Sequence, residues 1–123
     1  MSKNIEIKWL DQPEEHDYPA AGSYLSLIYG TQTAAKYVRR LRRVRMSGFK
    51  AKDIFRVSGL SLLGVSNSHV EKDRKKIISG HKLSPLLLVR DKNNAKGIIA
   101  DGYHRLCSVY TFDENALIPC KIV

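Results

Sequence analysis

The chain has 123 residues, of which 43% are apolar, and a formal net charge of +9. This length and composition predict one globular domain with a packed core, without internal repeats or low-complexity segments. No apolar run reaches the length of a membrane span, and the first residues lack the apolar core of a signal peptide. The expected location is therefore the cytoplasm.

The first fifty residues are expected to form a mostly helical extension that packs on the core of the remaining chain. Residues 5–9 alternate between apolar and polar side chains and predict a short strand. Asp17-Tyr18-Pro19 is a helix-start signal, and the apolar side chains after it have helical spacing, so they predict a helix that Gly30 ends; these side chains are Ala21, Tyr24, Leu25 and Ile28. A second helix is expected from Thr31 or Thr33 to Ser47-Gly48.

Almost all of the excess positive charge lies in and just after this second helix. The segment from Lys36 to Arg56 holds nine Lys or Arg residues and one acidic residue, whereas the rest holds twelve basic and eleven acidic residues. A segment of this charge attracts anions, so its partner would be nucleic acid, a nucleotide or an acidic protein. An equally weighted alternative is that the arginines form a solvated helix face without a binding role. The candidate nucleic-acid contacts are Arg39, Arg40, Arg42 and Arg43.

The middle of the chain is expected to supply a strand and then a helix. Residues 53–57 predict a strand, and residues 60–63 an extended segment. Ser68-His69-Val70-Glu71 matches the capping box that opens a helix, here as far as Gly80. In this interpretation Glu71 is a capping residue and His69 a surface residue of the first turn.

The last forty residues predict a hairpin, a helix and a final strand. The apolar run at residues 83–89 is typical of a strand covered on both faces, and a polar turn at 91–97 joins it to the next strand. Residues 116–123 form the last strand. Cys107 and Cys120 have no metal-ligand spacing, so we expect two buried free thiols and no metal site built from them.

The segment from Ile98 to Leu106 reads as a strand that ends at Asp101, turns at Gly102 and opens a helix. His104 and Arg105 lie in the first helical turn, where free N–H groups and the helix dipole disfavour cations. A bound anion such as phosphate would explain two cations at this place. The alternative is structural, with Asp101 as a turn residue, Arg105 as a surface ion pair and His104 as a partly buried side chain.

Asp101-Gly102-Tyr103-His104-Arg105 resembles the phosphate-binding turn of the ParB/sulfiredoxin superfamily. ADP-dependent free-serine kinases of that superfamily carry Asp-Gly-His-His-Arg, which differs only at Tyr103. The order of elements from about Asp53 to Val123 is also similar. The resemblance implies an α+β fold with a small mixed sheet flanked by helices over residues 51–123, and residues 1–50 lie outside it as the helical extension.

The resemblance also implies a ligand and roles for the residues of the turn. The ligand would be a nucleotide such as ATP, ADP or CTP, or phosphate. Gly102 and Tyr103 would supply the backbone cradle, and His104 and Arg105 would bind the phosphate. Asp101 could hold Mg²⁺ or accept a proton from a substrate hydroxyl, and Glu71 is the nearest candidate for the catalytic glutamate of the kinases.

Three functions follow as alternatives. The first is nucleotide or phosphate binding at the turn, with hydrolysis or phosphoryl transfer as an extension, so that enzyme activity stays open. The second is a non-enzymatic DNA-associated module that uses the basic segment, and the third is docking of the basic helix to an acidic protein. Sulfinic-acid reduction is excluded because Tyr103 replaces the cysteine that this chemistry requires.

Overall fold

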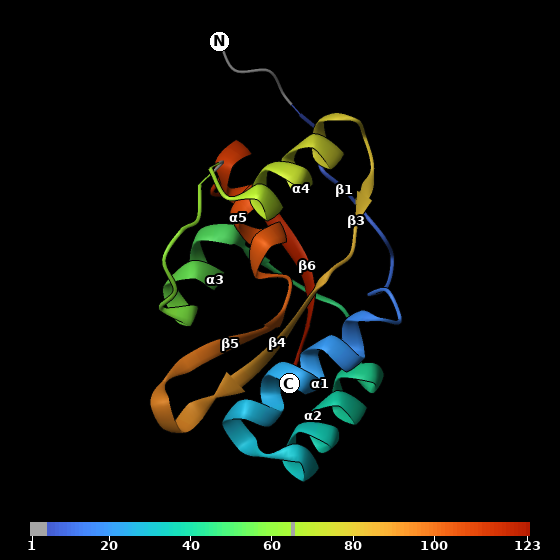
Figure 1. Cartoon of the computed structure of the whole chain (residues 1–123), viewed down its shortest axis with the longest axis vertical. Coiled ribbons are helices and arrows are strands. Elements are labelled where there is room, and N and C mark those ends of the chain that lie inside the picture. The colour runs from blue at the N-terminus through green and yellow to red at the C-terminus, as the bar shows by residue number, and fades with distance from the viewer. Residues whose placement is uncertain (1–4, 65) are drawn as a thin grey trace.

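The structure is a computed structural model that describes residues 5–64 and 66–123, and it has an α+β fold with a small mixed sheet flanked by helices (Figure 1). The helices are α1 (Asp17–Tyr29), α2 (Thr31–Arg43), α3 (Ala51–Ser58), α4 (Ser68–Ile78) and α5 (Tyr103–Phe112). The strands are β1 (Lys8–Trp9), β2 (Ser47–Lys50), β3 (Lys82–Leu83), β4 (Leu86–Asp91), β5 (Lys96–Asp101) and β6 (Leu117–Ile122).

The main sheet has the strand order β2-β6-β4-β5. Strands β4 and β5 form the expected antiparallel hairpin, and a short 3₁₀ helix at Lys92–Asn94 lies in its turn. Strand β6 runs parallel to β4 and antiparallel to β2, while β1 and β3 form a separate parallel pair. The helix α5 thus connects the edge strand β5 back to β6 in the interior of the sheet.

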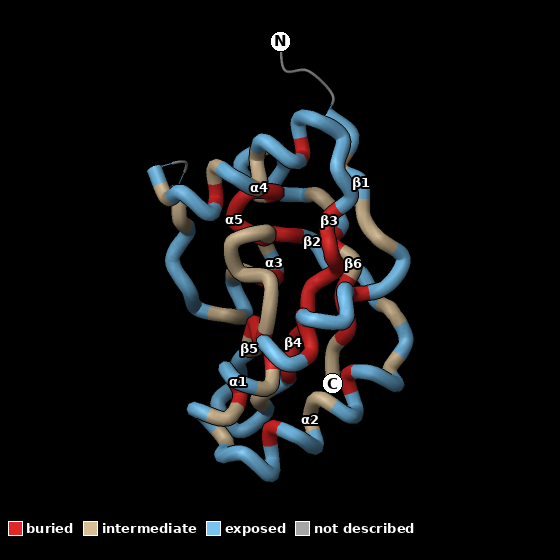
Figure 2. The backbone as a smooth tube through the Cα atoms, turned by 45° about the vertical axis from the view of Figure 1, so that its right-hand side comes forward, coloured by how far each residue is buried: buried red, intermediate tan, exposed pale blue. Residues whose placement is uncertain are grey.

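Alternating side chains of β4 divide the apolar core between the two faces of the sheet. Leu86 and Leu88 face a core built with α3, α4 and α5, whereas Leu87 and Val89 face a second core built with α1 and α2. All four side chains are buried, which confirms a strand covered on both faces. Figure 2 shows buried residues concentrated along β4, whereas most residues of α1 and α2 are exposed or only partly buried.

The helix expected before Gly30 is confirmed as α1, and the helix expected from Thr31 or Thr33 is confirmed as α2; both contribute to the second core. The expected end of the second helix is wrong, because residues 47–50 form β2 and pair with β6. The strand expected at residues 5–9 is reduced to Lys8–Trp9, which pairs with β3. No helix in the described part of the chain is long and apolar enough to cross a membrane.

The strand expected at residues 53–57 is also wrong, because this segment lies within the helix α3. Ala51 and Ile54 are buried and Phe55 packs beside them, which is the i, i+3, i+4 pattern of one helical face. The helix ends at Gly59, whose φ of +68° is the left-handed conformation typical of a helix C-terminus. Five residues with three apolar side chains are too few to distinguish a strand from one face of a helix.

The helix expected from Ser68 is confirmed as α4, but its cap is Asn67 rather than the capping box. The Asn67 Oδ1 atom accepts hydrogen bonds from the backbone N–H groups of His69, at 2.9 Å, and Val70, at 3.2 Å. Glu71 therefore has no capping role here and pairs with Arg74 instead. The apolar run at 83–89 is interrupted at Ser84-Pro85, so β3 and β4 are separate strands.

Candidate functional site

The turn between β5 and α5 has the strand–glycine–helix form that the sequence predicts. Asp101 ends β5, Gly102 has a φ of +108°, and α5 begins at Tyr103. A Cβ atom on Gly102 would lie 2.6 Å from the Cγ atom of Leu86, so the turn needs glycine for both its conformation and its close packing.

The first turn of α5 has backbone N–H groups that make no hydrogen bond within the helix. The first hydrogen bond of the helix runs from the N–H of Leu106 to the carbonyl of Gly102, at 2.9 Å, and no side chain caps the turn. By helix geometry, the N–H groups of the three preceding residues have no partner within the helix. The positive end of the helix dipole lies at the same place.

A pocket of about 200 Å³ opens between this turn and α4, and we call it the α4–α5 pocket. It is lined by His69, Lys72, Asp73 and Lys76 of α4 and by residues 101–105. The four α4 residues follow the i, i+3, i+4, i+7 spacing of one helical face. Sequence reasoning missed Lys72 and Lys76, although this spacing is a signal that could have indicated them.

His104 of α5 and His69 of α4 come together in the lining of the pocket. Their ring centroids lie 4.9 Å apart, so His69 is more than an isolated surface residue of its helix. The Ser108 hydroxyl of α5 donates to the carbonyl of Val70 at 2.8 Å, which fixes the two helices to each other. The hydroxyl of Tyr103 donates to the carbonyl of Ser61, so Tyr103 contributes its backbone rather than its hydroxyl to the turn.

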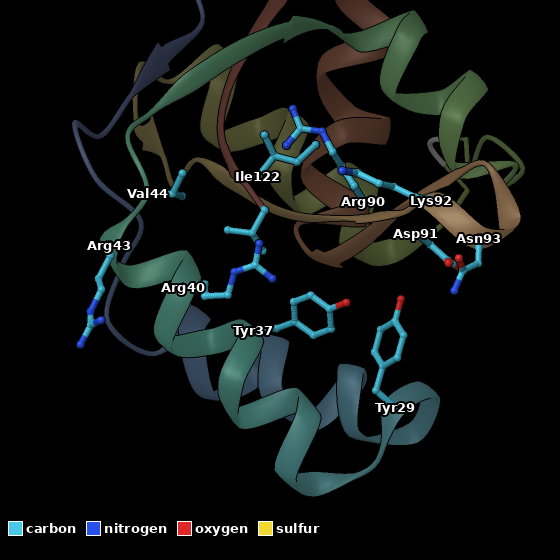
Figure 3. Close-up of a pocket in the computed structure, with 11 residues that line it drawn as sticks. Tyr29, Tyr37, Arg40, Arg43, Val44, Arg90, Asp91, Lys92, Asn93 and Ile122 are labelled. Carbon is cyan, nitrogen blue, oxygen red and sulfur yellow. The ribbon is translucent and has the colours of Figure 1, made fainter.

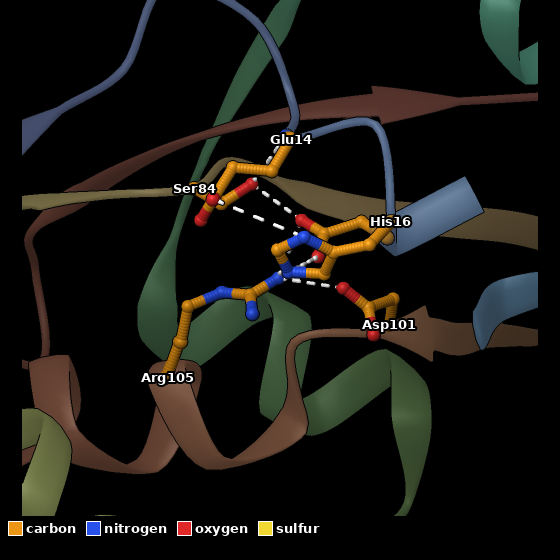
Figure 4. Close-up of polar contacts among 6 residues, drawn as sticks. Glu14, His16, Ser84, Asp101 and Arg105 are labelled. Atoms are coloured by element: carbon orange, nitrogen blue, oxygen red, sulfur yellow. Dashed lines mark hydrogen bonds and ion pairs between the residues drawn. The ribbon is translucent and has the colours of Figure 1, made fainter. Parts of the chain in front are cut away.

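Arg105 lines the pocket, but carboxylates hold its guanidinium group. Its Nη2 atom lies 2.8 Å from Asp101 and 3.5 Å from Asp17, and Figure 4 shows the side chain reaching from α5 toward Asp101. Its Nε atom is buried without a hydrogen-bond partner among the described residues. Burial raises the pKa of Asp101, although the adjacent guanidinium acts to lower it.

Asp17 extends this group to the start of α1. Its carboxylate is 4% exposed and accepts a hydrogen bond from the Ser84 hydroxyl, and His16 Nε2 lies 3.3 Å away. Ser84 in turn accepts a hydrogen bond from the N–H of Glu14 at 3.0 Å. The start of α1, the segment before β4 and the first turn of α5, which are distant in sequence, thus meet at Asp17 (Figure 4).

The structure does not bring Glu71 to the pocket. Its carboxylate lies 3.1 Å from Arg74, which also donates to the hydroxyl of Thr111 near the far end of α5. Glu71 and Asp101 therefore do not share a site. Asp73 is the acidic residue of α4 that lines the α4–α5 pocket.

The four arginines of α2 are all exposed, but they do not form one surface. Arg42 pairs with Glu15 at 2.6 Å and lies over the ring of Tyr18. Arg40 and Arg43 instead line a hollow beside the β4–β5 hairpin. Arg39 does not line this hollow and has no ion pair with a described residue. The basic segment is thus split between two sides of the helix.

In the described ranges, no cluster of three His, Cys, Asp or Glu side chains could hold a metal ion. In comparisons with known proteins, the chain matches no family model, no curated protein and no solved structure.

Proposed function

We propose that the protein binds the phosphate group of a nucleotide, or phosphate itself, in the α4–α5 pocket. The observation that carries the proposal is the convergence of two positive features. Residues 103–105, whose N–H groups have no partner within α5, line the same pocket as Lys72 and Lys76 of α4. A helix N-terminus with added cations is a recurrent way to bind phosphate.

The size of the pocket favours a phosphate group as the part of the ligand that it encloses. Its volume of about 200 Å³ is below the range of roughly 300–1,000 Å³ that encloses most of a drug-sized ligand. The base and sugar of a nucleotide would therefore lie outside it. His104 and His69, which line the pocket, are placed to donate hydrogen bonds to phosphate oxygens.

Arg105 has a supporting role in this proposal. Its ion pair with Asp101 spans the turn, and its contact with Asp17 fixes the start of α5 to α1. The resemblance to the phosphate-binding turn of the ParB/sulfiredoxin superfamily supports the same location. The proposal is limited to binding, because Asp101 is engaged by Arg105 and Glu71 lies outside the pocket.

A thermal-shift screen against ATP, ADP, CTP, GTP and inorganic phosphate, each with and without Mg²⁺, tests this function. A ligand that binds only the native state raises its melting temperature by mass action. The variant Lys72→Gln should weaken binding by roughly ten- to a hundredfold, since a charged hydrogen bond contributes roughly 1.5–3 kcal/mol. His104→Gln should also weaken binding, because the imidazole is lost as a hydrogen-bond donor to the phosphate.

Lys75→Gln is the matched control, because Lys75 is an exposed lysine of the same helix that does not line the pocket. It removes the same charge and should leave binding within about twofold, as expected for an exposed charge outside the site. Equal losses in Lys72→Gln and Lys75→Gln would contradict the site. The absence of a shift with every ligand would contradict the function.

A further inference from the structure

A second concave surface lies between α2 and the β4–β5 hairpin, and it shares no residue with the α4–α5 pocket. Its volume is about 700 Å³, and we call it the tyrosine hollow (Figure 3). It is lined by Tyr29, Tyr37, Arg40, Arg43, Val44, Arg90, Asp91, Lys92, Asn93, Ile122 and Val123.

Four basic side chains line the tyrosine hollow, Arg40 and Arg43 from α2 and Arg90 and Lys92 from the hairpin. Arg40 lies beside the ring of Tyr37, whereas Arg43, Arg90 and Lys92 lie at the rim and extend away from the two rings (Figure 3). Among the described residues, none of these four side chains takes part in an ion pair, in contrast to Arg42. The acidic residue of the lining is Asp91, whose carboxylate accepts a hydrogen bond from Asn94 at 2.8 Å.

Two aromatic rings also line the tyrosine hollow. The rings of Tyr29 and Tyr37 are half-buried, with centroids 5.0 Å apart and planes inclined by 47°. In Figure 3 both rings lie between α2 and the hairpin, with Arg40 beside Tyr37. The guanidinium carbon of Arg40 lies 5.6 Å from the centre of the Tyr37 ring, which presents a combined cationic and aromatic surface.

From this arrangement we propose that the tyrosine hollow binds single-stranded nucleic acid. A base stacks against Tyr37 beside Tyr29, and the phosphates on either side of it contact the basic side chains at the rim of the hollow. Aromatic side chains flanked by cations are the common means of binding single strands, since every base has a face that can stack. The proposal is independent of phosphate binding in the α4–α5 pocket.

The basic surface extends beyond the hollow, which favours a strand over a single nucleotide. Lys36, Arg40 and Arg43 follow the i, i+4, i+7 spacing along α2, so Lys36 continues the row away from the hollow. A mononucleotide would leave most of this row without an anion. A duplex keeps its bases stacked inside and cannot place one against the tyrosines.

Fluorescence anisotropy with a labelled oligothymidine of about ten nucleotides, within the usual site size of such proteins, tests the proposal at low salt. The double variant Arg40→Gln/Arg43→Gln should weaken binding about tenfold or more, and the salt slope should fall by about 1.4, since each single-strand phosphate contact contributes about 0.7. Tyr37→Leu should weaken binding, whereas Tyr37→Phe should not, because phenylalanine keeps the ring.

Arg39→Gln/Arg42→Gln is the matched control, since it removes the same charge from the same helix outside the hollow. Lys92→Gln tests the contribution of the hairpin to binding separately from that of α2, and Lys96→Gln is its control because Lys96 does not line the hollow. Equal losses in the two double variants would overturn the site. Binding of a duplex, or of thymidine monophosphate, as tight as that of the oligonucleotide would overturn the single-strand assignment, and no binding at low salt would overturn both.

Discussion

At the residue scale, the two cysteines show how burial alone sets chemical behaviour. Cys107 and Cys120 are both free and 0% exposed, as expected from their sequence context. Burial raises the pKa of the Cys120 thiol from an ordinary value of 9.0 to about 11, and burial raises the pKa of Cys107 as well. Since the thiolate is the reactive form, both side chains should be inert in the folded protein.

We therefore predict that a disulfide reagent such as 5,5′-dithiobis(2-nitrobenzoate) modifies neither thiol in the native state near neutral pH. Denaturant should expose two reactive thiols per chain. The raised pKa also predicts how the free energy of unfolding depends on pH. The neutral Cys120 thiol stabilises the folded state fully below pH 9.0, and this stabilisation is lost as the pH rises through about 11. Rapid modification of the native protein, measured by absorbance, would contradict this burial.

At the element scale, α4 carries both the pocket lysines and a cap that the structure assigns to Asn67. Asn67→Ala should lower the free energy of unfolding by about 1 kcal/mol, because two N–H groups lose their acceptor. Ser68→Ala should change it by less than about 0.5 kcal/mol, since an exposed side chain without such a role contributes little. Urea unfolding of both variants checks the assignment, and a larger loss in Ser68→Ala would favour the capping box instead.

A helix or turn could be predicted where neighbouring residues in the sequence determine it, and was missed where backbone geometry or more distant residues decide. The Asp101-Gly102 turn and α5 follow from a glycine and a regular apolar spacing, so the sequence was sufficient for them. The cap of α4 was missed because Asn67 and Ser68 are adjacent residues that can both cap, and only backbone geometry decides between them. The helix α3 was missed because its apolar face begins at Ala51, before the segment 53–57 for which a strand was expected.

The candidate sites depend even more on tertiary packing. Lys72 and Lys76 line the α4–α5 pocket because α4 packs its other face on the core. Arg42 differs from Arg40 because Glu15 and Tyr18, both on or near α1, lie on only one side of α2. A helical pattern predicts that such residues share a face, but it does not say which element lies opposite.

At the scale of the whole molecule, Asp17 connects the parts that the sequence analysis treated separately. It lies in α1, accepts a hydrogen bond from Ser84 before β4, and contacts Arg105 in α5. Lys121 of β6 makes a similar link, since its Nζ donates to the carbonyl of Arg42 in α2 at 3.0 Å. The helical pair α1–α2 is thus fixed by buried polar contacts as well as by its apolar face.

We predict that Asp17→Ala lowers the free energy of unfolding by about 2–4 kcal/mol. Breaking a buried charged pair typically costs about 3–5 kcal/mol, and here Arg105 keeps Asp101 as a partner, which reduces the loss. Asp11→Ala is the control, because Asp11 is an exposed acidic residue that precedes the same helix. Unfolding should remain a single transition in both variants, when fluorescence of Trp9 and circular dichroism are compared. A loss below about 0.5 kcal/mol in Asp17→Ala, within the range of ordinary surface substitutions, would show that the apolar face alone holds α1–α2 on the sheet.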